Sequence, residues 1–140
     1  MTERRDFIKT SLAGAASLPA VAQQRPLRVG MLGTGNRGGS LMGRVLRVPW
    51  AQVTALCDID EAALAKARDA VQTAGQPKPA TYTGSPEAYR KLLDRNDVDA
   101  VIVATPWELH VPMSVHAMQA GNAVSVEVPA AQTVEDCWKL

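Results

Sequence analysis

The stretch LRVGMLGTGNRG, residues 27–38, decides the fold of this chain. The apolar run 27–32 predicts a buried strand, and glycines occupy the first, third and sixth positions of the turn 33–38. In a dinucleotide-binding turn the first glycine permits a tight bend, the second lets a pyrophosphate approach the backbone, and the third lets the next helix pack on the strand. We therefore expect Gly33, Gly35 and Gly38 to hold a dinucleotide at the N-terminus of a helix, whose free N–H groups attract phosphate.

An acidic residue follows this turn at the distance that such a site requires. Asp58 stands 20 residues after Gly38, directly after a second expected strand at 52–57. Its carboxylate is expected to accept hydrogen bonds from the adenosine ribose and to repel a 2′-phosphate, which favours NAD over NADP. Within the turn, Asn36 and Arg37 are expected to contact the pyrophosphate or the adenosine; the alternative is that they are exposed loop residues.

Strands and helices alternate along the rest of the chain. Strands are expected at 27–32, 52–57, 81–83, 98–104 and 123–128, and helices at 38–48, 61–73, 85–95, 111–120 and from 133 onward. This alternation predicts an α/β fold, an open doubly wound parallel sheet of the Rossmann type with strand order 3-2-1-4-5. Ligands of such sheets bind outside the carboxyl ends of the strands, near the switch between strands one and four.

The first 22 residues are typical of a twin-arginine export signal rather than of the domain. Arg4 and Arg5 are followed by Phe7 and Lys9, a weakly apolar segment, and a small-residue cleavage site at 20–22. The alternative is a short amphipathic helix packed on the domain. We expect the twin-arginine export machinery as a partner, a periplasmic or secreted location, a linker at 23–26 and the dinucleotide-binding domain at 27–140. Because this route carries folded proteins, we also expect NAD to be loaded before export and then retained.

Composition narrows the function classes further. The chain has 140 residues, 46% of them hydrophobic, and a net charge of +1, which fits one globular domain and gives no indication of nucleic-acid binding. No apolar run reaches membrane-spanning length, so we expect no stable membrane anchor. The two cysteines form no disulfide framework, and Cys57 is expected to pack in the core. No metal-ligand spacing occurs, and no metal site is expected.

Together with the glycine turn, the sequence from 97 to 129 resembles the Gfo/Idh/MocA family of NAD(P)-dependent oxidoreductases. The resemblance rests on DVDAVIVATP at 97–106, WELH at 107–110, AGN at 120–122 and VEVP at 126–129, and it extends over nearly everything after the signal. Members of this family carry a second, mostly β, substrate domain. Leu140 falls inside an expected helix, so we expect this chain to be a truncated part of a longer protein, and the substrate domain to be missing from this part.

One position departs from the common family pattern. Strand five usually ends in Glu-Lys-Pro, with a lysine that assists proton transfer, whereas this chain has Val128 there. The segment EVPAA at 127–131 is instead similar to glycoside hydrolase family 109. That resemblance implies hydrolysis of terminal α-N-acetylgalactosaminides: the sugar C3 hydroxyl is transiently oxidised by NAD, the C1 group is eliminated, water adds and C3 is reduced again. A carbohydrate would then be the small-molecule partner.

The resemblance also places further residues at the cofactor. It implies contacts from Trp107, His110, Glu127 and Val128; the alternatives are local packing for Trp107, helix capping for His110 and a salt bridge to a nearby base for Glu127. The catalytic acid and base are expected in the missing domain. Two other functions stay open: an NAD-dependent sugar dehydrogenase of the wider family, and a non-catalytic dinucleotide-binding fragment. The oligomeric state also stays open, with a homo-oligomer as one alternative.

Overall fold

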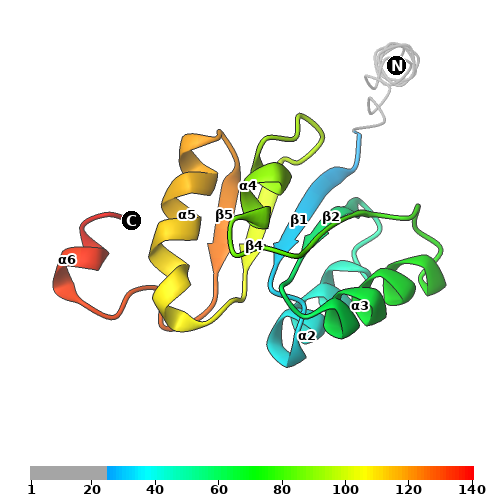
Figure 1. Ribbon diagram of the computed structural model, residues 1–140. Helices are drawn as coiled ribbons and strands as arrows, with labels where there is room; N and C mark the ends of the chain where they lie inside the picture. Colours follow the sequence, from blue (N-terminus) through cyan, green and yellow to red (C-terminus); the bar gives the residue numbers. More distant parts are fainter. Residues whose placement is uncertain (1–24) are drawn as a thin grey trace, which may run out of the picture.

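A five-stranded parallel sheet forms the centre of the computed structural model, which describes residues 25–140 (Figure 1). Its strands are β1 Leu27–Leu32, β2 Ala51–Cys57, β3 Ala80–Tyr82, β4 Ala100–Val103 and β5 Ala123–Val126. They lie in the order β3-β2-β1-β4-β5, with every neighbouring pair parallel. The expected doubly wound sheet and its strand order are therefore confirmed. The proposed export signal, 1–22, lies outside the described residues.

Helices follow the strands along the chain, and all but the last of them lie between two successive strands. They are α2 Asn36–Val45, α3 Glu61–Thr73, α4 Ala88–Leu93, the 3-10 helix η2 Trp107–Leu109, α5 His110–Gln119 and α6 Val134–Cys137. The helix α3 has the expected bounds because both of its ends carry strong local signals. The Asp60 side chain accepts hydrogen bonds from the N–H groups of Ala62 and Ala63, and Gly75 follows the helix with a φ of 79°. None of the described helices is long and apolar enough to cross a membrane.

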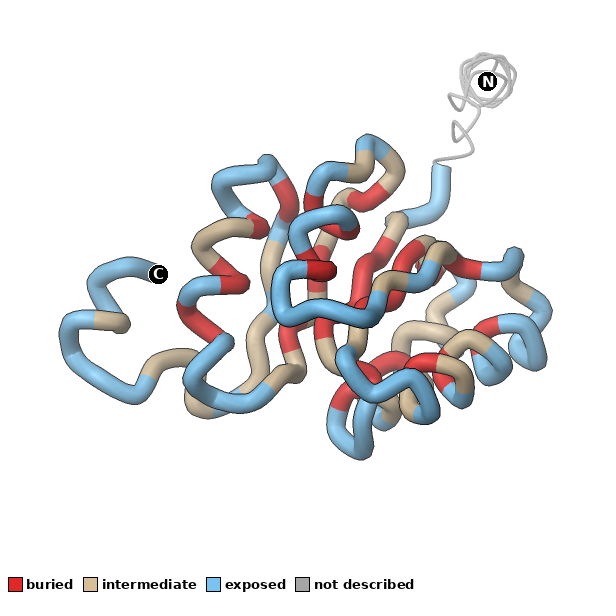
Figure 2. The backbone as a smooth tube through the Cα atoms, in the orientation of Figure 1, coloured by how far each residue is buried: buried red, intermediate tan, exposed pale blue. Residues whose placement is uncertain are grey.

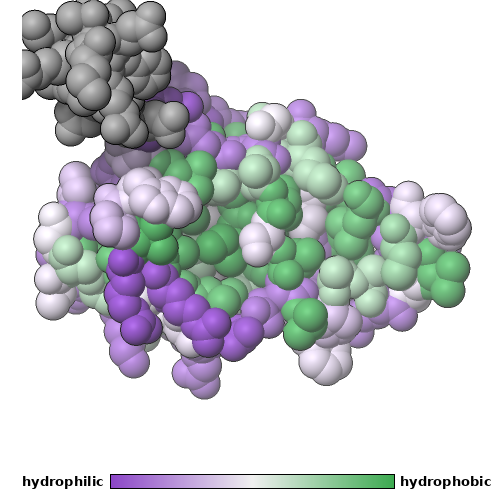
Figure 3. Space-filling view, turned by 180° about the vertical axis from the view of Figure 1, so that it is seen from behind, coloured by the Kyte–Doolittle hydropathy of each residue, from purple (hydrophilic) through white to green (hydrophobic). Residues whose placement is uncertain are grey.

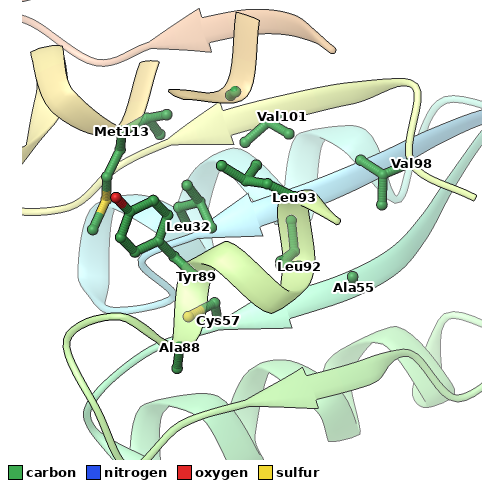
Figure 4. Close-up of a cluster of buried hydrophobic side chains, with 12 residues drawn as sticks. Leu32, Ala55, Cys57, Ala88, Tyr89, Leu92, Leu93, Val98, Val101 and Met113 are labelled. Atoms are coloured by element: carbon green, nitrogen blue, oxygen red, sulfur yellow. The ribbon is translucent and has the colours of Figure 1, made fainter. Parts of the chain in front are cut away.

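Two apolar cores hold the layers together. On one face, α2 and α3 pack against the sheet through residues such as Met31, Met42 and Val71. On the other face, α4 and α5 cover a cluster that includes Leu92 and Met113, drawn in Figure 4. In Figure 2 the buried residues follow the strands and the inner sides of the helices. Burial on both faces explains why the central strands are almost continuously apolar.

The outer strand β5 is less covered than the strands at the centre. Val124 and Val126 pack against the core under α5, whereas Ala123 and Ser125, on the opposite face, are exposed. In the view from behind, hydrophobic surface extends across the middle of the molecule (Figure 3). Among the described residues, β5 therefore forms an edge of the sheet.

Several element boundaries differ from the sequence-based expectation. The helix α2 begins at Asn36 rather than at Gly38, because the bend at residues 33–35 already turns the chain into helical geometry. β5 ends at Val126 rather than at 128, since the last ladder bond is donated by the Glu127 N–H to the Val103 carbonyl, where β4 itself ends. The turn and the ends of β4 and β5 thus become loops around one edge of the sheet.

Candidate dinucleotide site

A cleft of about 780 Å³ opens at the carboxyl ends of the strands. Its walls come from the glycine turn, the loop after β2, the loop before α4, the loop after β4 and the start of α5. Of the residues expected to bind the cofactor, Gly33, Gly35 and Asp58 line the cleft. The cleft therefore lies where a doubly wound sheet binds its ligands.

Two of the three glycines of the turn have the structural roles expected of them, and the role of the third remains a prediction. Gly33 has a φ of 86°, and a Cβ there would lie 2.5 Å from the carbonyl oxygen of Ala104. A Cβ at Gly38 would lie 2.0 Å from the carbonyl oxygen of Gly33, so only glycine lets α2 pack this closely on the turn. At Gly35, by contrast, a Cβ would meet no atom of the described chain within 4 Å. This open space at the cleft wall is where a pyrophosphate would approach the backbone.

The N-terminus of α2 also fits an anion. Its cap is Gly35, no side chain of the described residues caps it, and its first turn contains no acidic residue. The first N–H groups of a helix lack intrahelical partners, and the helix dipole makes this end positive. Asn36 and Arg37 are exposed in this first turn, beside the position that a phosphate would take. The residues present therefore fit the pyrophosphate of a dinucleotide.

Asp58 holds the turn and faces the cleft at the same time. Its Oδ2 accepts hydrogen bonds from the backbone N–H of Thr34 at 2.6 Å and from the Thr34 hydroxyl at 3.0 Å. Its Oδ1 accepts one from the Asp60 N–H at 3.0 Å. Each carboxylate oxygen has two acceptor positions, so Oδ1 can still accept a ribose hydroxyl. The binding of a ribose by Asp58 remains a prediction. The geometry shows that Asp58 also has a structural role, because it holds Thr34 in the turn.

An ion pair joins the glycine turn to the end of β5. Arg37 Nη2 donates to Glu127 Oε1 at 2.7 Å, which is the alternative that the sequence left open for Glu127. The hydrogen bond with Glu127 raises the pKa of Arg37 above its usual range. The hydrogen bond with Arg37 in turn lowers the pKa of Glu127, with a smaller contribution from the charge of His110. Neither residue is among those that line the cleft, so direct contacts of either side chain with a dinucleotide remain predictions.

The other residues assigned by resemblance lie around the cleft rather than in its wall. Trp107, which begins η2, is 57% exposed, and Val128, in the loop after β5, is 77% exposed. His110 is buried, with Nδ1 2.8 Å from the Pro129 carbonyl oxygen and Nε2 2.9 Å from the Thr105 carbonyl oxygen. Its position at the first residue of α5 bridges two loops, a role that the sequence analysis did not anticipate.

The cleft also has lining residues that the sequence analysis missed. They include Ile59, which is 72% exposed, Ser85 and Glu87 before α4, and Met113 in α5. The order of the strands contained a signal for most of them, because loops after parallel strands meet at one edge. The exposed apolar side chain of Ile59, directly after Asp58, provides a surface against which a flat base could pack.

Cys57 lies in the same wall as a buried thiol. Burial, with a smaller contribution from the negative charge of Asp58, raises its pKa to about 11. It belongs to the apolar core under α4, as expected for a packing residue. Within residues 25–140, no cluster of three or more potential metal ligands occurs.

The fold, the turn and the open space at Gly35 define a dinucleotide-binding domain of the Rossmann class. Residues 27–140 match the model of the Gfo/Idh/MocA family, described as an oxidoreductase family with an NAD-binding Rossmann fold. The chain belongs to this family, and this part of it is the family's NAD-binding domain.

Curated relatives carry a more specific name. A glycosyl hydrolase family 109 protein of Stenotrophomonas maltophilia is 46% identical over 145 residues, which cover 99% of this chain and 32% of the relative. Another of that name, from Shewanella pealeana, is 42% identical over 120 residues, 86% of this chain and 26% of the relative. The resemblance to this subgroup is confirmed, and the chain spans about a quarter to a third of the length of these relatives.

Solved structures share the fold at lower identity. Myo-inositol 2-dehydrogenase from Lactobacillus plantarum has a TM-score of 0.69 and 23% identity, covering 82% of this chain and 32% of that one. Scyllo-inositol dehydrogenase from Lactobacillus casei, solved with NAD(H) and scyllo-inositol, has a TM-score of 0.68 and 19% identity, over 80% and 31%. A 3-ketoreductase from Actinomadura kijaniata, in complex with NADP and TDP-benzene, has a TM-score of 0.68 and 25% identity, over 82% and 33%.

Proposed function

We propose that this chain is the NAD-binding part of an exported glycosidase that hydrolyses terminal α-N-acetylgalactosaminides. The observation that carries the proposal is the 46% identity, across 99% of the chain, with a protein named for glycosyl hydrolase family 109. The proposed reaction oxidises the sugar at C3, eliminates the C1 group, adds water and reduces C3 again. When bound, NAD would supply the hydride acceptor and then the hydride donor.

The residues of this domain would bind and orient the cofactor. The N-terminus of α2 and the open backbone at Gly35 would hold the pyrophosphate. Oδ1 of Asp58 would accept a ribose hydroxyl, and its charge would oppose a 2′-phosphate, which favours NAD over NADP. The nicotinamide half would then extend past β1 toward the ends of β4 and β5, near Thr105 and Glu127.

Val128 supports the assignment to a glycosidase rather than to an ordinary dehydrogenase. Its side chain has no titratable group, so it can neither donate nor accept the proton that a lysine would transfer. It is nevertheless exposed at the carboxyl edge of the sheet, where such a lysine would stand. The acid and base of the reaction are therefore assigned to the part of the longer relatives that this chain does not span.

The test compares sugar cleavage with cofactor turnover. We would supply a chromogenic α-N-acetylgalactosaminide, without added cofactor, to the full-length protein. Release of the chromophore without net NADH formation would support the proposal. Steady NADH formation from a free sugar would replace it with a sugar dehydrogenase. Tight NAD binding with neither activity would indicate a dinucleotide-binding fragment.

We also propose that residues 1–22 direct export through the twin-arginine machinery. The support is the order of Arg4, Arg5, Phe7 and Lys9 before the small-residue site at 20–22. A reporter fused after residue 26 should reach the periplasm only in cells that have this machinery, and a variant with both arginines replaced by lysine should stay inside. Export that is unchanged in that variant would refute the signal, and exported protein that purifies without NAD would refute retention of the cofactor.

A further inference from the structure

His110 lies between two loops that emerge from neighbouring strands. It begins α5, is 1% exposed, and each of its ring nitrogens faces a backbone carbonyl. Nδ1 is 2.8 Å from the oxygen of Pro129, after β5, and Nε2 is 2.9 Å from the oxygen of Thr105, after β4. Thr105 itself lines the cleft, whereas the imidazole does not. The ring therefore connects the cleft wall to the neighbouring loop without touching the cleft.

The chemistry of the two partners determines how many protons the ring must carry. A carbonyl oxygen only accepts hydrogen bonds, whereas a neutral imidazole has one nitrogen that donates and one that accepts. Both contacts can be hydrogen bonds only if both nitrogens carry a proton. Turning the ring over would place carbon atoms against the two oxygens and would lose both bonds.

Three charged side chains lie on the segments around His110, two of them acidic and one basic. Glu127, which follows β5, is close enough for its carboxyl to interact electrostatically with the His110 ring. Arg37 of α2 pairs with the same carboxylate at 2.7 Å. Glu108, in η2, is exposed, and it is the acidic residue of the short helix that precedes His110. In a neutral ring, one nitrogen and the carbonyl oxygen that faces it would both be unpaired acceptors, which costs free energy in a buried site. The double donor replaces this cost with that of burying a charge.

We propose that His110 is a positioning residue that donates from both ring nitrogens and sets the nicotinamide side of the site. It does so by holding the loop after β4 against the loop after β5. This inference rests on the proposed NAD site. With Asp58 at the end of β2 and the glycine turn after β1, a dinucleotide that crosses the turn brings its nicotinamide half toward β4 and β5. The Thr105 hydroxyl, buried and without a partner among the described residues, stands in that part of the wall.

The proton count is tested by nitrogen NMR of the folded chain. The sequence contains two histidines, so His116→Gln leaves His110 as the one imidazole to observe. We expect both ring nitrogens of His110 to show the signature of protonated nitrogen at about pH 7, with or without NAD. One protonated and one bare nitrogen would overturn the proposal. This readout does not depend on NAD binding, so it separates a failure of this inference from a failure of the proposed function.

The positioning role is tested by comparing NAD with ADP, which lacks the nicotinamide riboside. In the full chain, His110→Asn can replace only part of the bridge, and we expect it to weaken NAD binding about tenfold or more while ADP binding changes less than about twofold. His116→Gln is the matched control and should leave both affinities unchanged. Equal weakening of NAD and ADP, or unchanged NAD binding in a folded variant, would overturn the role.

Discussion

At the residue scale, Asp58 combines a structural and a ligand-binding role. Its Oδ2 is used by the N–H and hydroxyl of Thr34, and Oδ1 remains partly free. We predict that Asp58→Ala weakens NAD binding by about 1.5–3 kcal/mol, because a charged acceptor is lost. Calorimetric titration measures the affinity, and thermal unfolding shows whether the turn has loosened.

The matched control for this prediction is Thr34→Val. It removes the hydroxyl that donates to Oδ2 but leaves the backbone N–H and Oδ1 in place. We expect it to lower the free energy of unfolding by about 1 kcal/mol and to change NAD affinity little. If Asp58→Ala binds NAD as tightly as the original chain, the ribose role is wrong.

The two cysteines should differ sharply in reactivity. Burial raises the pKa of Cys57 to about 11, whereas Cys137 is exposed in α6. Because the thiolate is the reactive form, we predict that iodoacetamide at about pH 8 labels Cys137 and leaves Cys57 unlabelled until the chain is denatured. Mass spectrometry after digestion measures both sites, and Cys137→Ser should give a folded chain without label. Rapid labelling of Cys57 in that variant would contradict the prediction.

Local geometry could be predicted from the sequence, whereas partners distant in sequence could not. The spacing was enough to predict that Gly38 packs closely on the turn itself, whereas the carbonyl that crowds Gly33 comes from the end of β4 and depends on the fold. The pair of Arg37 and Glu127 joins positions 90 residues apart, and only the fold brings them together. The bridge made by His110 likewise needs two backbone carbonyls, which no pattern of side chains can indicate.

At the element scale, the Arg37–Glu127 pair links the first turn of α2 to the end of β5. We predict that Arg37→Gln weakens ADP and NAD binding equally, because it removes a cation beside the expected pyrophosphate. Glu127→Gln should weaken NAD alone, since the end of β5 lies on the nicotinamide side. Each effect should be on the order of threefold, as expected for an exposed pair.

Titration of each variant with NAD and with ADP gives the comparison. The Arg37→Gln effect should diminish as salt is added, because salt screens exposed charges. The lowered pKa of Glu127 implies that the pair persists at neutral pH and weakens only as the carboxyl becomes protonated in acid. A loss of ADP binding in Glu127→Gln would show that the two residues act as one structural unit instead.

Element boundaries were predictable where a local signal marks them. The bounds of α3 follow from Asp60 at one end and Gly75 at the other. The expected strand at 98–104 is longer than the observed β4, Ala100–Val103, because Val98 packs in the core before the ladder begins. Apolar character indicates burial, but a strand ends where its partner stops offering hydrogen bonds, and that depends on the neighbouring strand.

At the scale of the whole molecule, the strand order was predictable because strand–helix alternation permits few arrangements. The position of the cleft followed from that order, since loops after parallel strands share one edge. The opposite edge could not be foreseen. There Asp99, before β4, binds the start of β1, accepting from the Arg28 backbone N–H at 2.9 Å, from Arg28 Nη2 at 2.9 Å and from Arg25 Nη1 at 2.6 Å.

This cluster should govern acid stability without affecting the cofactor. The hydrogen bonds from Arg28 and then Arg25 hold the pKa of Asp99 well below its usual range. The unfolded carboxyl titrates near 4, so the unfolded chain binds the proton first as the pH falls. The stabilisation is therefore complete at neutral pH and is lost progressively below about pH 4. Asp99→Asn should lower the free energy of unfolding by about 1–2 kcal/mol at neutral pH, and by less in acid.

Urea unfolding at several pH values measures the free energy of unfolding, and titration with NAD measures the affinity for the cofactor. Asp69→Asn is the matched control, because its carboxylate pairs with Arg68 on the exposed surface of α3 and should contribute little at any pH. NAD affinity should be unchanged in Asp99→Asn, since the cluster lies at the edge of the sheet opposite the cleft. The difference in free energy of unfolding between the original chain and Asp99→Asn could instead stay constant from neutral pH to about pH 3. In that case the Asp99 charge does not stabilise this edge, and the shape and packing of the side chain would be the remaining cause.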